Sequence, residues 1–265
     1  MRLYQQLLTE NNCYRTGRTI VPKGVMVHST GANNPNLRRY VAPDDGRLGS
    51  PSSANWNTAQ PDGRSVCVHG FIGRLADGTV ASYQTLPWTC RGWHCGSGDR
   101  GSGNNTHIGF EICEDDLEDP EYFAAVYREA VELTAYLCKT FGLDPLADGV
   151  VICHSEGHQR GIASNHADVM HWFPRHGKDM DDFRRDVAAE LKGGEEDVTQ
   201  EQFDAMMEVY LRERGSLPPS DWSRDAREWA EAEGLIHGDE NGDKQYQNFV
   251  TREQMCTFLK RFAEQ

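Results

Sequence analysis

Two histidines each follow directly on a short apolar stretch of the sequence. His28 comes after residues 24–27, Gly-Val-Met-Val, and His154 comes after residues 150–153, Val-Val-Ile-Cys. Runs of this length and composition are typical of buried strands. We therefore expect both imidazoles at strand ends, where side chains from separate parts of the chain can converge.

A third segment, residues 165–171, adds further nitrogen and oxygen donors. It follows a loop rich in Gly and Ser and contains His166, Asp168 and His171. Two imidazoles with one more donor and an open fourth position are the ligand set of a catalytic zinc site. The compact H-E-x-x-H spacing of a helical zinc site is absent, so spacing alone leaves a metal site and a coincidence of histidines both open.

Glu111 interrupts an apolar run formed by residues 108–110 and 112–113. A carboxylate inside a sheet is costly unless it has a partner or a chemical task. Zinc hydrolysis needs a group that takes a proton from water and passes it to the leaving nitrogen. Strand alternation leaves a second interpretation open, in which Glu111 faces solvent while its neighbours face the core.

The elements that must position these residues alternate between short apolar runs and helical stretches, a pattern that favours a sheet covered by helices. Residues 122–141 and 180–191 repeat apolar residues at helical spacing. We predict an α/β fold with a central, mostly mixed β-sheet flanked by helices and a second, small helical domain. The expected strands are 24–28, 66–72, 79–83, 107–112 and 150–154.

A domain boundary is predicted at residues 193–198, Gly-Gly-Glu-Glu-Asp-Val, because two glycines and three acids after a helix are typical of a solvated linker. Residues 1–192 then form the catalytic domain and residues 199–265 a small helical domain. Nine of the ten histidines lie at or before His176. Histidine-based chemistry therefore belongs to the first domain.

Composition excludes several classes of function. The mean hydropathy of −0.67 and 38% hydrophobic residues are ordinary for a globular chain. The sequence contains no run of about 18 apolar residues, so no membrane span is predicted. The net charge of −14 would repel nucleic acid. The first residues lack the apolar core of a signal peptide. Eight cysteines are too sparse for a disulfide scaffold, and the redox state of Cys90 and Cys95 stays open.

Four segments together resemble the zinc-dependent N-acetylmuramoyl-L-alanine amidases of the type-2 amidase and peptidoglycan-recognition fold, which include phage and prophage endolysins. The resemblance spans roughly residues 18–190. The segments are Val25-Met26-Val27-His28-Ser29-Thr30, Cys67-Val68-His69-Gly70, Arg91 to Cys113 with its Trp93-His94-Cys95-Gly96 and Ile108-Gly109-Phe110-Glu111, and Val151-Ile152-Cys153-His154.

The resemblance implies a role for each candidate. His28, His154 and Asp168 would bind Zn²⁺, and Glu111 would be the general base. His166 stands where the family usually has a lysine that stabilises the oxyanion, and an imidazole can donate one hydrogen bond there. Because the loop before Asp168 is longer than usual in the family, His166 or His171 remain alternatives for the third ligand.

Substrate contacts are expected from aromatic and histidine side chains of the loops. Trp56, Trp93 and Trp172 lie in polar or Gly- and Pro-rich segments and could offer rings on which sugars or the stem peptide stack, although ordinary packing is the alternative. His69 and His94 belong to the segments that carry the resemblance, and we assign both to substrate binding.

The C-terminal region is similar to an S-layer homology motif. Residues 222–238 lead from a Trp-bearing helix to Gly-Leu-Ile-His-Gly, and residues 249–255 read Phe-Val-Thr-Arg-Glu-Gln-Met, where Thr251 is the expected N-cap of a helix. Such motifs usually occur in three copies and tether proteins to cell-wall polysaccharide. Only one clear copy is present, so formation of a homo-oligomer or a purely structural role stays open.

The predicted function is that of an endolysin, a peptidoglycan hydrolase that cuts the amide between N-acetylmuramic acid and L-alanine of the stem peptide. It would be made in the bacterial cytoplasm without a signal peptide and would lyse the cell wall after a membrane lesion. Two alternatives remain: a module that recognises peptidoglycan without cutting it, and a zinc peptidase that cuts within the stem peptide.

Overall fold

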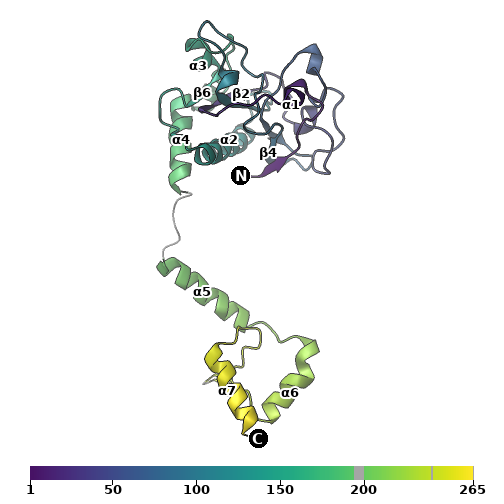
Figure 1. The fold of residues 1–265 in the computed structure, drawn as a ribbon, viewed down its shortest axis with the longest axis vertical. Coiled ribbons are helices and arrows are strands. Elements are labelled where there is room, and N and C mark those ends of the chain that lie inside the picture. The colour runs from purple at the N-terminus through teal and green to yellow at the C-terminus, as the bar shows by residue number, and fades with distance from the viewer. Residues whose placement is uncertain (194–199, 240, 265) are drawn as a thin grey trace. The chain divides into compact units, whose positions relative to one another are not determined.

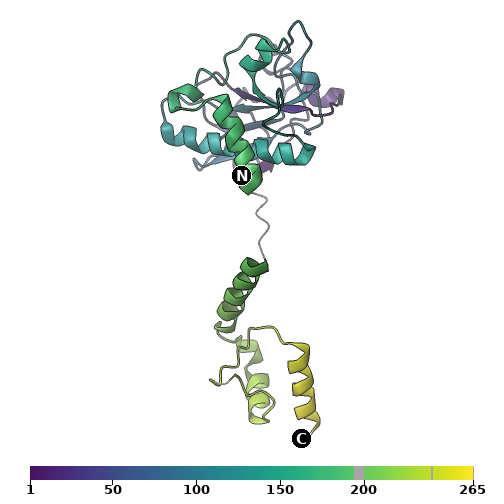
Figure 2. The same cartoon turned by 90° about the vertical axis from the view of Figure 1, so that its left-hand side faces the viewer.

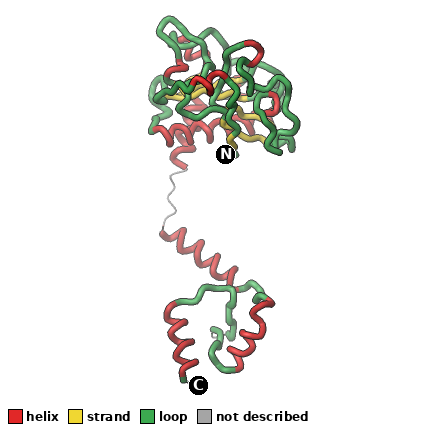
Figure 3. Tube along the Cα trace, turned by 45° about the vertical axis from the view of Figure 1, so that its right-hand side comes forward, coloured by secondary structure: helices red, strands yellow, loops and turns green. Residues whose placement is uncertain are grey.

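The computed structural model describes residues 1–193, 200–239 and 241–264 (Figure 1). The chain divides into two compact units, Met1–Glu195 and Glu196–Gln265. The predicted linker 193–198 begins at Gly193, which ends a helix, and its other residues lie outside the described residues. All the strands of the described residues belong to the first unit, whereas the second contains helices and loops (Figure 3).

The first unit is built on a six-stranded sheet with the order β1-β4-β3-β5-β2-β6. Only the β3–β4 pair is antiparallel, so the sheet is mixed. The strands are β1 (Leu3–Gln5), β2 (Gly24–Ser29), β3 (Gly70–Arg74), β4 (Val80–Gln84), β5 (His107–Ile112) and β6 (Val151–Cys153). The helices are α1 (Asn12–Thr16), α2 (Pro120–Phe141), α3 (His154–Gln159) and α4 (Met180–Gly193), with short 3-10 helices at Leu37–Arg39, Pro61–Gly63, Gly103–Asn105 and Phe173–His176.

Strand alternation divides the sheet into two faces with different tasks. Val25, Val27, Phe110 and Cys153 point into the main core, which they share with the apolar faces of α2 and α4. Helices α2 and α4 pack against each other under this face (Figures 1 and 2). Because side chains alternate along a strand, His28, Gly109 and Glu111 belong to the opposite face.

The predicted α/β fold class is confirmed. Helix α2 has Asp119 as its N-cap and left-handed Gly142 after its last residue, which are the expected start and stop signals. The predicted strand 66–72 is shorter than expected, because β3 starts at Gly70 and Cys67 pairs instead with Trp93 of a loop. The edge strand β1 was not predicted, since three half-polar residues carry too little pattern.

The second unit consists of α5 (Gln200–Gly215), a 3-10 turn at Asp221–Ser223, α6 (Arg224–Ala232) and α7 (Arg252–Ala263). Thr251 caps α7 in a reciprocal capping box with Gln254, whose side chain accepts from the Thr251 backbone at 2.8 Å. Only Ala230 and Leu235 are buried among the apolar side chains that are described in this unit. Over the described residues of the whole chain, no helix is long and apolar enough to cross a membrane.

Candidate active site

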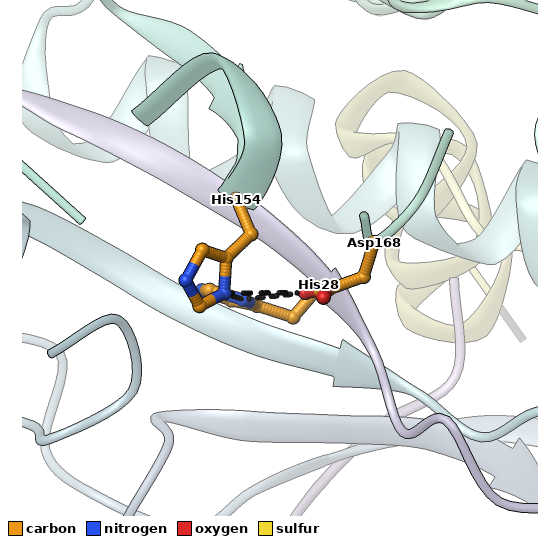
Figure 4. A group of neighbouring side chains, drawn as sticks. All are labelled: His28, His154 and Asp168. Atoms are coloured by element: carbon orange, nitrogen blue, oxygen red, sulfur yellow. Dashed lines mark hydrogen bonds and ion pairs between the residues drawn. The ribbon is translucent and has the colours of Figure 1, made fainter. Parts of the chain in front are cut away.

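Three donor atoms from distant parts of the sequence converge above the sheet (Figure 4). His28 Nδ1 lies 3.1 Å from His154 Nδ1 and 3.1 Å from Asp168 Oδ2. The third separation, His154 Nδ1 to Asp168 Oδ2, is 3.3 Å. Both imidazoles are buried and the carboxylate is partly buried.

The strands explain this convergence. His28 lies near the end of β2, and His154 follows β6, which is the parallel neighbour of β2 with Val27 opposite Cys153. Asp168 comes from the loop between α3 and the 3-10 helix at Phe173–His176, where the fully buried Val169 anchors the chain beside it. Parallel strands end at one edge of a sheet, so the two histidines are brought together by the topology itself.

The donor set fits zinc. A tetrahedron with bonds of about 2.0–2.1 Å has edges of about 3.3 Å, close to the three separations between these donors. Each histidine also makes an outer contact through its other nitrogen: His28 Nε2 lies 2.9 Å from His94 Nδ1, and His154 Nε2 lies 3.3 Å from Ser164 Oγ. Such contacts orient the rings of metal ligands.

Electrostatics favour the protonation states of His28 and Asp168 that a cation needs. Burial lowers the pKa of His28, although Asp168 opposes that effect. Burial also disfavours ionisation of Asp168, but the adjacent imidazoles of His154 and His28 outweigh it and hold the pKa of that carboxyl well below its usual range. Neutral imidazoles beside an ionised carboxylate are the forms that coordinate a metal.

Glu111 stands directly beside this cluster. It pairs in register with His28 across β2 and β5, and its Oε2 is buried without a hydrogen-bond partner. Burial raises the pKa of Glu111 well above its ordinary value, and the nearby carboxylates of Asp168 and Glu114 raise it further. A carboxylate in this setting has a high affinity for a proton, as a general base requires.

His166 is a further polar group next to the cluster. Its ring centroid lies 4.7 Å from that of His154, and its Nδ1 is 3.1 Å from Ser164 Oγ. His171 lies elsewhere, with Nε2 2.9 Å from Glu114 Oε1. Among the described residues, the structure thus joins Asp168, and neither His166 nor His171, to the two histidines.

A cavity of about 370 Å³ opens over these groups. Its lining combines His154 and Asp168 of the cluster with aromatic and polar side chains from loops and strand ends. The lining residues are Ser29, Thr30, Gly31, Trp56, Arg64, Val66, Val68, Trp93, His94, Gly96, Glu111, His154, Ser164, His166 and Asp168.

Comparison with known proteins identifies the family. A family model described as N-acetylmuramoyl-L-alanine amidase matches residues 17–171, more than half of the chain. This chain belongs to the N-acetylmuramoyl-L-alanine amidase family. The resemblance of roughly residues 18–190 to these amidases is therefore confirmed, and the protein is an amidase. The similarity of the C-terminal region to an S-layer homology motif stays a prediction. A comparison with curated proteins gave no match.

Several solved structures are similar to the amidase at low sequence identity. A mutant of PlyL is 19% identical, with 71% of this chain and 99% of that chain covered and a TM-score of 0.50. The Staphylococcus aureus hydrolase AmiA, solved with its ligand, is 18% identical over 72% and 82% of the two chains, with a TM-score of 0.49. A mutant endolysin from Bacillus subtilis is 23% identical over 71% and 99%, with a TM-score of 0.47.

Two of the predicted substrate contacts are wrong. Trp172 of the amidase is fully buried, with its ring 5.5 Å from Phe123 and 6.4 Å from Tyr122, because the chain after Val169 turns this side chain into the main core. His69 is also fully buried: its Nε2 lies 2.6 Å from the carbonyl oxygen of Cys90, and its Nδ1 accepts from the backbone of Gly109. Neither side chain reaches the cavity.

The other three predicted contacts do line the cavity of the amidase. Trp93 is 39% exposed, with the guanidinium of Arg91 5.1 Å from its ring centre. Trp56 is half-buried and packs edge-on to Phe71 at 5.0 Å. His94 faces the cavity as well, but its ring also contacts His28.

Sequence reasoning missed two features of the cavity. Arg64 lines it with a side chain that is 68% exposed, and a lone arginine in a polar loop gave no signal. The contact between His94 and His28 was also missed, although the Trp-His pair in a Gly-rich loop marked the segment. Cys90 and Cys95 are both free thiols and lie in separate apolar clusters.

Proposed function

We propose that this amidase binds Zn²⁺ through His28, His154 and Asp168 and cleaves the amide between the lactyl group of N-acetylmuramic acid and L-alanine of the stem peptide. The observation that carries the proposal is the convergence of these three donors beside Glu111, at a cavity that His154, Asp168 and Glu111 line. Zinc, when bound, supplies a Lewis acid that makes water more acidic and polarises a carbonyl oxygen.

The side chains of the amidase divide the remaining work. Glu111 accepts a proton from the attacking water and delivers it to the leaving nitrogen, so that the products are a free carboxylate and a free amine. His166 would donate a hydrogen bond to the carbonyl oxygen as negative charge develops on it. Trp56 and Trp93 offer ring surfaces to the sugar or the peptide.

We also propose that the enzyme lyses the bacterial cell wall from outside the membrane, reaching it after a membrane lesion. The similar structure from Bacillus subtilis is itself named an endolysin. The second unit would then hold the enzyme at the wall, through cell-wall polysaccharide or through self-association. Its exposed aromatic side chains, such as Trp222 at 88% and Phe249 at 61%, support a surface that contacts something else.

Digestion of purified peptidoglycan tests the proposal. The full chain is incubated with peptidoglycan, with and without a chelator, and the soluble products are identified by mass spectrometry. We expect free stem peptides that begin with L-alanine, released only without the chelator and restored by added zinc. His28→Ala is the matched control and should release none.

Other product patterns would overturn the proposal. Shortened stem peptides would show that the same site cuts within the peptide. Peptidoglycan that is bound but left intact would identify a recognition module, and activity that resists the chelator would refute the role of zinc.

A further inference from the structure

His94 forms a hydrogen-bonded link between the backbone and His28, which the proposed function makes a zinc ligand. Its Nδ1 lies 2.9 Å from His28 Nε2, and its Nε2 lies 3.2 Å from the carbonyl oxygen of His107. His28 meets His94 through the nitrogen that points away from Asp168. The three groups therefore form a chain that leads to the metal-binding cluster.

The direction of the hydrogen bonds in this chain follows from its fixed end. A carbonyl oxygen can only accept, so the proton between His107 and His94 belongs to His94 Nε2. In a neutral imidazole the other nitrogen then carries a lone pair, so His94 Nδ1 accepts from His28 Nε2. The neutral His28 ring is left with an unprotonated Nδ1, which is the atom that faces His154 and Asp168.

The surroundings of His94 hold its ring in this place. A Cβ at Gly109 would lie 2.4 Å from His94 Nδ1, so only glycine at this position of β5 leaves room for the ring. The backbone N–H of His94 donates to Asn104 Oδ1 at 2.7 Å. Asn104 is fully buried and also donates to the carbonyl of Gly96, which fixes the loop that carries His94.

We propose that His94 is a positioning residue that fixes the Nε2–H tautomer of His28 and so presents the Nδ1 lone pair of His28 to the metal. This assignment rests on the proposed zinc site and replaces the substrate contact that the sequence suggested for His94. Loss of an outer partner of a metal ligand typically weakens metal binding about 10- to 100-fold.

Two substitutions of nearly equal size separate the hydrogen bond from packing. In His94→Asn, the side-chain oxygen can take the place of Nδ1 and accept from His28, whereas His94→Leu offers no acceptor. The dissociation constant of zinc is measured for the full-length protein by competition with a chromophoric chelator. We expect His94→Leu to bind zinc about 10- to 100-fold more weakly than the natural protein and His94→Asn to recover most of that loss.

The control is His176→Gln, which removes an imidazole whose Nε2 lies 3.1 Å from the carbonyl oxygen of Leu117 and whose ring stacks on Phe123. It should leave zinc affinity unchanged. Equal losses of zinc affinity in the two His94 variants would assign the effect to packing. An unchanged zinc affinity in His94→Leu would show that the hydrogen bond between His94 and His28 does not contribute to metal binding. Either result overturns the proposal.

The tautomer itself gives a readout that needs no variant. Long-range ¹H–¹⁵N correlation spectra of the natural, metal-free protein distinguish protonated from unprotonated imidazole nitrogens, and we expect His28 to carry its proton on Nε2. A proton on Nδ1 would overturn the inference even if His94→Leu does not fold. Failure of the natural protein to bind zinc would instead refute the proposed function, and the spectrum would still decide the role of His94.

Discussion

Acid should destabilise the first unit through His69, which the fold keeps neutral in its core. The side chain is fully buried, and its two nitrogens are occupied by the carbonyl oxygen of Cys90 and the backbone N–H of Gly109. Burial lowers the pKa of His69 to about 4, and the backbone hydrogen bonds only partly oppose that effect. The unfolded chain has an ordinary histidine pKa of about 6.5.

The sign and size of the effect follow from these two values. As the pH falls below about 6.5, the unfolded chain takes up a proton at His69 that the folded chain does not accept until about pH 4. The free energy of unfolding therefore decreases across this window. At about 1.36 kcal/mol per pH unit, the loss between pH 7 and pH 4 amounts to about 3 kcal/mol.

The variant His69→Gln isolates this contribution. The amide of glutamine does not titrate, and its nitrogen can still donate to the Cys90 carbonyl. The substitution therefore changes the free energy of unfolding by an amount that does not depend on pH. Amide hydrogen exchange in β5 and α2 reports the free energy of unfolding of the first unit without interference from the second. The natural protein should lose about 3 kcal/mol more than His69→Gln when the pH is lowered from 7 to 4.

The comparison between the two proteins cancels the contributions of other groups, including His28 and His107, whose pKa values burial also lowers. Parallel pH dependences in the natural protein and in His69→Gln would refute the reasoning. They would mean that His69 binds a proton as readily in the folded protein as in the unfolded chain.

Three further predictions concern the site and the second unit. Glu111→Gln should bind zinc like the natural protein but hydrolyse peptidoglycan about 10²- to 10⁴-fold more slowly, as measured by product release, whereas His28→Ala should lose both properties. Trp172→Ala should lower the free energy of unfolding by about 3–5 kcal/mol in denaturant titrations, because it leaves a cavity in the core. Trp93→Ala should leave stability nearly unchanged and weaken peptidoglycan binding, because Trp93 is exposed at the cavity. The second unit should make the full chain self-associate as its concentration rises in analytical ultracentrifugation, because Phe203, Met206 and other apolar side chains lie exposed on its helices.

Each of these predictions has a contradicting result. A zinc-loaded Glu111→Gln enzyme with natural turnover would remove Glu111 from the role of base. Equal loss of stability in Trp93→Ala and Trp172→Ala would contradict the difference in their burial. A second unit that leaves the full chain monomeric at every concentration would favour a role in binding polysaccharide.

Local pattern was enough to predict the frame of the first unit. Apolar runs of four to six residues identified β2, β5 and β6, since a strand buried on both faces needs apolar residues throughout. The same runs placed His28 and His154 at strand ends, and the structure shows that the two strands are neighbours. The alternation of residues along β5 left two interpretations for Glu111, and only the observed sheet, with α2 and α4 on the other face, shows that Glu111 faces the cavity.

The loops could not be assigned in this way. Trp93 and Trp172 both lie in polar segments, yet one is exposed at the cavity and the other is fully buried. Asp168 and His171 are three residues apart, and the sequence offered both as ligands. Which of them meets the histidines depends on how the loop closes over the core at Val169.

The sequence by itself determined most strands of the first unit, the helices α2 and α4 and the two histidines at strand ends, because hydrophobic periodicity is a property of neighbouring residues. The tertiary structure alone decided which loop side chains complete the site: Asp168 as the third donor, and His94 behind His28. These contacts join residues 66 to 140 positions apart. They form only when the whole domain packs, and no local pattern in the sequence encodes them.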